Sequence, residues 1–318
     1  MTEAKGWQWL RYGYVFLITA AFCYALVTQA DDLITGLHLL GPIPIANSIA
    51  FATGGVGCSG LVWYGIIRSL GGNISLADGA RMFFITQLGK YVPGSVWPVL
   101  MQADVARRIK MPIRVAMMAQ VLFMWVLVVT GTTISIPLGI VTLADALDLP
   151  SFNPWLLLFS LLFLVVLHPK ITSWVTARLL ALFKRPPLPG RLSWFATIHA
   201  IIWAMVMWGC FGGHLYVLTS TLNPDRFLLE LDIFPLTMGF AGAWVIGFII
   251  IIAPAGAGPR EAALYWLLAA MNLSHAVVVI AISRLALTVA DGIWAGLAAL
   301  TPRPASASPS DNEPVMGD

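Results

Sequence analysis

Long stretches without Asp, Glu, Lys or Arg alternate with short polar segments along most of this chain. Each stretch has at least 19 residues, and a helix that spans a bilayer needs about 20 apolar residues. A β-barrel would instead show short segments of alternating apolar and polar positions. The pattern predicts an all-α integral membrane protein, a polytopic helical bundle. The uncharged stretches are Tyr12–Ala30, Leu33–Ile67, Val115–Ala144, Leu149–Pro169, Leu192–Pro224, Ile233–Pro259 and Ala262–Ser283.

The stretches predict a series of spanning helices and one helix at the membrane surface. Residues 171–185 set Trp174, Leu179 and Leu182 against Arg178 and Lys184, which is typical of an amphipathic interfacial helix. The spans are expected over about 12–30, 43–67, 113–140, 153–168, 192–218, 234–252 and 275–300.

Small residues and one proline give two of these spans special features. The Gly-rich segment 54–60 offers a face that another helix can approach closely, which permits a homodimer, or else it marks a kink. Pro137 marks either the end of its span or a kink.

Two helix-breaking segments stand out from the apolar background. The first covers residues 89–98, with Lys90 just before Pro93 and Gly94, and the second covers residues 253–261. In lipid, broken helix is tolerated only where protein or a water-filled cavity satisfies the freed backbone groups. One break in each half (about 12–185 and 192–300) is typical of a transporter with re-entrant elements in inverted repeats around its substrate site.

Residues 71–110 predict two short helices on either side of the first break. Ser75 followed by Asp78 predicts a cap and a helix start near Leu76, and a second helix is expected from near Ser95 to about Lys110. Neither is long and apolar enough for a comfortable span, so we expect a re-entrant hairpin or two half-depth helices. An amphipathic surface helix followed by a loop is the alternative.

Composition and charge distribution agree with a membrane protein and predict its orientation. Hydrophobic residues make up 59% of the chain and charged residues 10%, with a mean hydropathy of +0.84, whereas soluble domains carry about 25% charged residues. Basic residues cluster at 5–11, 68–114 and 170–191, and acids dominate 31–32, 145–148 and 225–232. By the positive-inside rule, the N-terminus is expected in the cytoplasm. The expected location of the protein is the inner (plasma) membrane.

Four ionisable residues fall within or beside the last apolar stretches: Arg260, Glu261, Arg284 and Asp291. Such groups are costly at membrane depth and usually mark pathways or pairs. We expect Arg260 or Arg284 to pair with Asp291, leaving one guanidinium partly free for a phosphate. The alternative is that Arg260–Asp291 or Arg284–Glu261 are purely structural pairs.

No motif for a catalytic, metal or nucleotide site appears. Cys23, Cys58 and Cys210 stand apart in apolar runs and are expected to pack, as are His199 and His214. The sequence therefore predicts no enzyme, no metal, no cofactor and no nucleic-acid partner. It predicts a single transmembrane domain over 1–301 and a disordered tail over 302–318.

The residues of the two breaks resemble the signatures of a known family. Lys90-Tyr91-Val92-Pro93-Gly94-Ser95-Val96-Trp97 and Pro254-Ala255-Gly256-Ala257-Gly258-Pro259-Arg260-Glu261 are similar to motifs of the lysylphosphatidylglycerol synthase transmembrane (flippase-like) family. The resemblance covers about residues 10–300, and Pro259 directly before Arg260 departs from the pattern.

The resemblance implies a flippase that moves a phospholipid or a polyprenyl-linked lipid between leaflets. The soluble synthase domain of the best-known relatives has no counterpart here, so its activity is not carried over. The implied partner is a lipid with an anionic or polyprenyl-phosphate headgroup. The implied headgroup path comprises Lys90, Tyr91, Pro93, Gly94, Trp97, Arg260 and Glu261, to which the charge pattern adds Arg284 and Asp291.

Two other functions stay open. One is a membrane subunit or partner of a lipid-modifying enzyme, with Asp78 and Asp104 as candidate acids near the inner surface. The other is an assembly protein without transport.

Overall fold

The computed structural model describes residues 34, 37–91, 97–146, 160–224, 233–250 and 258–301 of the chain. Within these ranges the secondary structure is helical, with no β-strand. Four helices are long and apolar enough to cross a membrane, so the chain is a multi-pass helical membrane protein. They are α3 (Pro42–Ser69), α6 (Ile113–Ala146, apolar to Pro137), α9 (Trp194–Leu222) and α13 (Ala276–Leu300).

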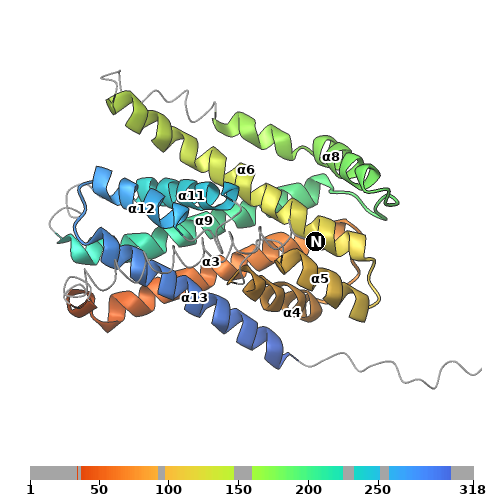
Figure 1. Cartoon of the computed structure of the whole chain (residues 1–318), viewed down its shortest axis with the longest axis horizontal. Coiled ribbons are helices and arrows are strands. Elements are labelled where there is room, and N and C mark those ends of the chain that lie inside the picture. Colours follow the sequence, from red (N-terminus) through yellow and green to blue (C-terminus); the bar gives the residue numbers. More distant parts are fainter. Residues whose placement is uncertain are drawn as a thin grey trace, which may run out of the picture.

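Helices α3 and α9 form the antiparallel centre of the bundle (Figure 1). Gly54 lies against Cys210 and Gly55 against the ring of Phe211, whereas Gly65 at the other end lies against His199. The absence of side chains at these glycines brings the two backbones close together. The small-residue face predicted for the second span is therefore used within the chain, and α3 is one continuous helix.

Helix α6 continues through Pro137 to Ala146, so the prediction that the helix ends near residue 140 was wrong. A neighbouring helix, α11 (Ile233–Ile249), packs on both α6 and α9. Trp208 of α9 donates a hydrogen bond to the hydroxyl of Thr130 of α6 (3.0 Å), and its ring meets Trp244 of α11 edge to face. These contacts bind the three helices into one wall of the bundle.

Residues 76–91 and 97–108 form the two arms of a helical hairpin that begins and ends at the same end of the bundle. It consists of α4 (Leu76–Gln87), the 3-10 helix η1 (Leu88–Tyr91) and α5 (Trp97–Arg108). Ser75 caps α4 as predicted, since its Oγ accepts the N–H of Asp78 at 3.1 Å. Helix α4 runs antiparallel to α13, with Phe84 stacked on Trp294. Each arm is about 18 Å long, roughly half the thickness of a bilayer.

The second hairpin starts from the opposite end of the bundle (Figure 1). Helix α11 runs antiparallel to α9, and α12 (Pro259–Ala270) turns back beside it, with Gly239 against Leu267. The arms of this hairpin, like those of the first, are shorter than a full span. The two hairpins, one from each half of the chain, therefore enter the bundle from opposite ends.

The region between the two halves differs partly from the prediction. The structure describes only the last part of the helix predicted over about 153–168. It ends before His168 as predicted, but Leu162–Leu167 is a 3-10 helix, η2. Helix α8 (Pro169–Leu182) confirms the amphipathic helix, with Trp174 and Leu182 exposed. The predicted first span (about 12–30) and the tail (302–318) lie outside the described residues.

Candidate functional site

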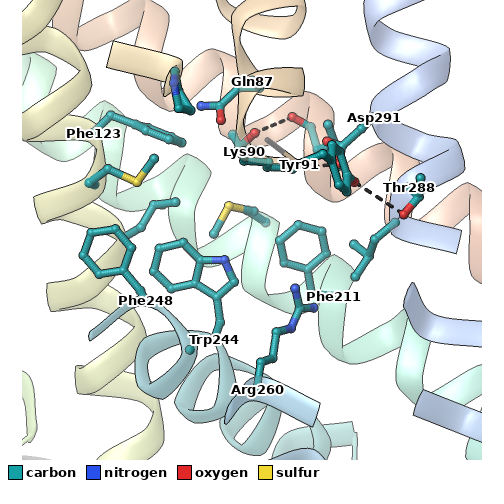
Figure 2. Close-up of a pocket in the computed structure, with 18 of the residues that line it drawn as sticks. Gln87, Lys90, Tyr91, Phe123, Phe211, Trp244, Phe248, Arg260, Thr288 and Asp291 are labelled. Carbon is teal, nitrogen blue, oxygen red and sulfur yellow. Dashed lines mark hydrogen bonds and ion pairs between the residues drawn. The ribbon is translucent and has the colours of Figure 1, made fainter. Parts of the chain in front are cut away.

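A cavity lies between the described ends of the two hairpins, with η1 on one side and the start of α12 on the other (Figure 2). It contains about 1240 Å³ of empty space, counting its mouth. Helices α3, α4, η1, α5, α6, α9, α11, α12 and α13 all contribute to its lining. Its polar lining comprises Ser59, Gln87, Lys90, Tyr91, Arg260, Arg284, Thr288 and Asp291.

The tip of the first hairpin is tied to α13 through Asp291. Oδ2 of Asp291 accepts Nζ of Lys90 at 2.7 Å and the hydroxyl of Tyr91 at 2.5 Å. Asp291 is 5% exposed and Lys90 is 35% exposed. Asp291 lies about ten residues from the C-terminal end of α13, or about 15 Å along the helix. This ion pair therefore lies near mid-depth, where a lone carboxylate would be costly.

The second ion pair connects α12 to α13. Nε of Arg284 lies 3.0 Å from Oε1 of Glu261. The other oxygen of Glu261, Oε2, accepts the N–H of Gly258 at 2.6 Å, at the start of α12. Gly258 has φ 94, a left-handed conformation that suits a residue without a side chain. Glu261 thus fixes both the start of α12 and the position of Arg284.

Arg260 reaches the cavity from the tip of the second hairpin without a comparable partner. Its side chain is 8% exposed, and its Nε and Nη2 have no hydrogen-bond partner among the described residues. Its guanidinium lies over the ring of Phe240, 4.6 Å from the centroid. Figure 2 shows the guanidinium extending from α12 into the cavity, beside Phe211. A buried cation with unused donors is a binding group for an anion.

Aromatic side chains cover the wall opposite the Lys90–Asp291 pair. Trp244 and Phe248 of α11 are stacked, with an interplanar angle of 4°, and Phe211 lies 5.2 Å from Phe240 between ring centroids. Phe123 of α6 lines the same cavity. This wall is apolar, and Figure 2 shows Arg260 beside it, across the cavity from Lys90 and Asp291.

The predicted site residues come together only in part within the described residues. Lys90, Tyr91, Arg260, Arg284 and Asp291 line the cavity, and Glu261 holds Arg284 from behind. Trp97 begins α5, but its side chain lies outside the described residues, as do Pro93 and Gly94.

Asp291 pairs with Lys90, a contact that was not predicted, and Arg284 pairs with Glu261, the arrangement considered as the structural alternative. The prediction of one guanidinium without a partner corresponds to Arg260 in the described part of the chain.

Several site residues gave no signal in the sequence. Gln87 and Thr288 are ordinary polar residues in helices, and Phe240 and Trp244 are two of many aromatic residues. Thr288 precedes Asp291 by nearly one turn of α13, so the helical spacing from a suspected acid could have found it.

Other polar groups in the bundle have structural roles. His214 is fully buried, and its ring nitrogens pair with Ser48 (2.9 Å) and Ser283 (2.8 Å), which confirms it as a packing residue. Oδ2 of Asp78 accepts the hydroxyl of Ser75 at 2.7 Å at the exposed start of α4. Among the described residues, no group of three His, Cys, Asp or Glu side chains could hold a metal ion.

Comparison with models of known protein families gives no match, and comparison with curated proteins gives none either.

Proposed function

We propose that this protein moves a lipid between the leaflets of the membrane and carries its anionic headgroup in the cavity between the two hairpins. The observation that carries the proposal is Arg260, a buried guanidinium with unused donors that faces an open chamber. A guanidinium binds two phosphate oxygens at once, and burial in a low dielectric strengthens that contact. The lipid is a phospholipid or a polyprenyl-linked lipid, whose chains remain in the bilayer.

The structural alternative for Arg260 is weaker. A buried charge kept only for stability would normally be paired and hydrogen-bonded, because desolvation costs several kcal/mol per ion. The neighbouring Arg284 has such an arrangement with Glu261, whereas Nε and Nη2 of Arg260 find no acceptor in the described residues. The contact with Phe240 contributes only about 2 kcal/mol in a desolvated setting. An anionic ligand would supply the missing acceptors.

The charge distribution supports an orientation for the bundle. Basic residues gather at the end where α3 ends and α6 and α9 begin: Arg68, Lys110, Arg114, Lys184, Arg185 and Arg191. At the opposite end, the described residues 37–50, 215–224 and 270–283 contain no Lys or Arg. By the positive-inside rule, we place the basic end in the cytoplasm. The hairpin bearing Lys90 then enters from the cytoplasm, and the one bearing Arg260 enters from outside.

The sequence resemblance to the flippase-like family supports the same function. Both of its motifs fall on the hairpin tips that meet at the cavity, at Lys90-Tyr91 and at Arg260-Glu261. We propose membership of that family on this basis, with an inner-membrane location.

Lipids that copurify with the protein test the proposal. Wild type, Arg260→Met and Arg178→Met would be purified in a mild detergent, and their bound lipids identified by mass spectrometry. Arg178→Met is the matched control, because it removes the same charge from the exposed face of α8. We expect one anionic lipid class to be enriched on wild type and on the control, and lost from Arg260→Met. A bulk-membrane profile on all three proteins, or equal enrichment on Arg260→Met, would contradict the proposal.

A further inference from the structure

Asp291 is the only acidic residue in the described lining of the cavity. One oxygen of its carboxylate holds both Lys90 and Tyr91, and so closes the tip of the first hairpin onto α13. Tyr91 also donates to the hydroxyl of Thr288 at 3.4 Å, one turn before Asp291 on the same face of α13. Lys90, at the end of the first hairpin, is thus neutralised by a carboxylate of the protein itself.

An anionic headgroup in the cavity competes with this carboxylate for Lys90. Arg260 is near enough to Tyr91 and Asp291 to interact with both electrostatically, and Figure 2 shows Lys90 and Arg260 extending into the cavity from opposite hairpins. A phosphate bound at Arg260 gains a second cation if Lys90 turns to it. Asp291 then loses its counter-ion at mid-depth, where an unpaired carboxylate is costly and its neutral form is favoured.

We propose that Asp291 takes up one proton when Lys90 transfers to the lipid headgroup, so that one proton travels with each lipid anion. This inference rests on the proposed lipid transport and adds its coupling ion. In this proposal the proton comes from water and binds the Asp291 carboxylate. Lys90 keeps its own protons and exchanges a carboxylate for a phosphate. Since one negative and one positive charge enter together, the charge of the occupied site equals that of the empty site.

The surroundings of Asp291 leave it as the group that can exchange its proton. Two residues of η1, Lys90 and Tyr91, contact Asp291 directly. The charged residues of α12 near the site are Arg260 and Glu261. Glu261 is held by Arg284, the nearest charged residue on α13 itself, and by the N–H of Gly258.

The other helices packed on α13 place their titratable groups elsewhere. Arg81 of α4 binds the carbonyls of Ala298, Ala299 and Thr301 at the end of α13. His214 of α9 pairs with Ser283, about two turns before Asp291. Arg68, the charged residue of α3, binds Asn73 and the carbonyl of Ile74 at the cytoplasmic end.

The pH dependence of lipid binding tests the coupling. The probe is a fluorescent short-chain phosphatidylglycerol, because its phosphodiester keeps a single negative charge between about pH 5.5 and pH 8. Its affinity for the purified full chain would be titrated over that range. Uptake of one proton makes binding about tenfold tighter for each unit that the pH falls, as long as Asp291 is ionised in the empty protein.

Three variants assign the proton to this group. Asp291→Asn is expected to bind the probe with the same affinity at every pH. Lys90→Met is expected to lose the dependence as well, because Asp291 then lacks its counter-ion before the lipid arrives. The double variant Lys90→Met/Asp291→Asn leaves neither charge alone, so it gives the same reading if a single variant fails to fold. Asp104→Asn, the control, removes an exposed carboxylate outside the cavity lining and is expected to keep the slope.

The outcomes distinguish failure of the proton coupling from failure of the proposed lipid transport. An affinity of wild type that does not change with pH, or a slope that survives Asp291→Asn, overturns the proton coupling while leaving lipid binding in place. The absence of binding at every pH, with both phosphatidylglycerol and a polyprenyl phosphate, overturns the proposed function itself. Calorimetry in two buffers of different ionisation enthalpy counts the protons directly, and the expected number is one per lipid.

Discussion

The two hairpins present their basic residues to the cavity in opposite ways. Lys90, at the tip of the first hairpin, is 35% exposed and pairs with Asp291 at 2.7 Å. Arg260, at the tip of the second, is 8% exposed and stacks on Phe240, with two of its nitrogens unpaired in the described structure. The more exposed cation has a counter-ion, whereas the more buried cation has none among the described residues.

This contrast separates a cation that is paired in the empty protein from one that we propose is kept for an anionic ligand. The Lys90–Asp291 pair ties the described end of the first hairpin to α13 and satisfies both charges. Burial of Arg260 carries a desolvation cost with little return in the empty protein, and in the proposed function a bound anion offsets this cost. Substitutions at the two cations and at the helices that hold the hairpins test this division.

Replacement of Arg260 by Met should uncouple binding from stability. Loss of one partner of a buried charged hydrogen-bond pair costs about 2–5 kcal/mol, so lipid affinity should fall by about 30-fold or more. The thermal midpoint of the empty protein should stay the same or rise, because a buried unpaired charge is removed. Parallel binding and thermal-shift measurements check both, and a fall in the midpoint without a change in affinity would assign Arg260 to the fold.

Replacement of Lys90 by Met should instead destabilise the protein. It leaves Asp291 buried without its counter-ion, which costs about 3–5 kcal/mol in a fully buried pair. Since Lys90 is partly exposed, about 1–3 kcal/mol is expected after solvent screening. Adding Asp291→Asn should recover most of this loss. A double-mutant cycle by chemical unfolding measures the coupling, and a value near zero would show that the pair does not hold the hairpin.

The first arm of the second hairpin, α11, packs closely against α9. A Cβ at Gly212 would lie 2.9 Å from the backbone Cα of Thr237 on α11, whereas a Cβ at Gly209 meets nothing within 4 Å. Gly212→Ala should therefore lower stability by about 1–3 kcal/mol through overpacking. Gly209→Ala, the matched control one turn away, should be neutral or stabilising by up to about 1 kcal/mol. Equal behaviour of the two variants would argue against the tight α9–α11 contact.

The start of the first hairpin gives the smallest effect. Ser75→Ala removes the side-chain acceptor of the Asp78 N–H and should cost about 1 kcal/mol. Ser173→Ala, on α8 and away from a helix start, is the control and should change stability by less than about 0.5 kcal/mol. Thermal unfolding of both variants checks the difference, and an unchanged midpoint for Ser75→Ala would mean that α4 does not depend on this cap.

Much of the fold could be predicted because local sequence sets helix ends. Ser75, the break after Gly89 and Pro259 mark ends of α4, η1 and α12 within a few residues, and long uncharged runs define the spans. The 3-10 helix Leu162–Leu167 could not be predicted, because its apolar residues suit an α-helix equally well. The continuation of α6 through Pro137 likewise depends on tertiary packing that local propensity does not contain.

The sequence identified several charged residues of the site, but it did not predict which of them form ion pairs. Arg260, Arg284 and Asp291 stood out because charges are rare in apolar helices. Their sequence spacing favoured pairing within the last two helices, and it held no information on Lys90. That residue reaches Asp291 only because the first hairpin enters from the end where α13 finishes. Long-range pairing of this kind is a property of topology, not of local pattern.

The rate of lipid flipping in proteoliposomes tests directly whether the guanidinium of Arg260 carries the lipid headgroup. Phosphatidylglycerol with a fluorescent headgroup-proximal label would be placed in both leaflets, and the loss of fluorescence after an impermeant reductant would report exchange between leaflets. With wild type or Arg178→Met, we expect the reductant to remove the fluorescence of all labelled lipid. With Arg260→Met, we expect the labelled lipid of the inner leaflet to stay protected, as in protein-free vesicles. Exchange by Arg260→Met at the wild-type rate would contradict the claim that its guanidinium carries the headgroup.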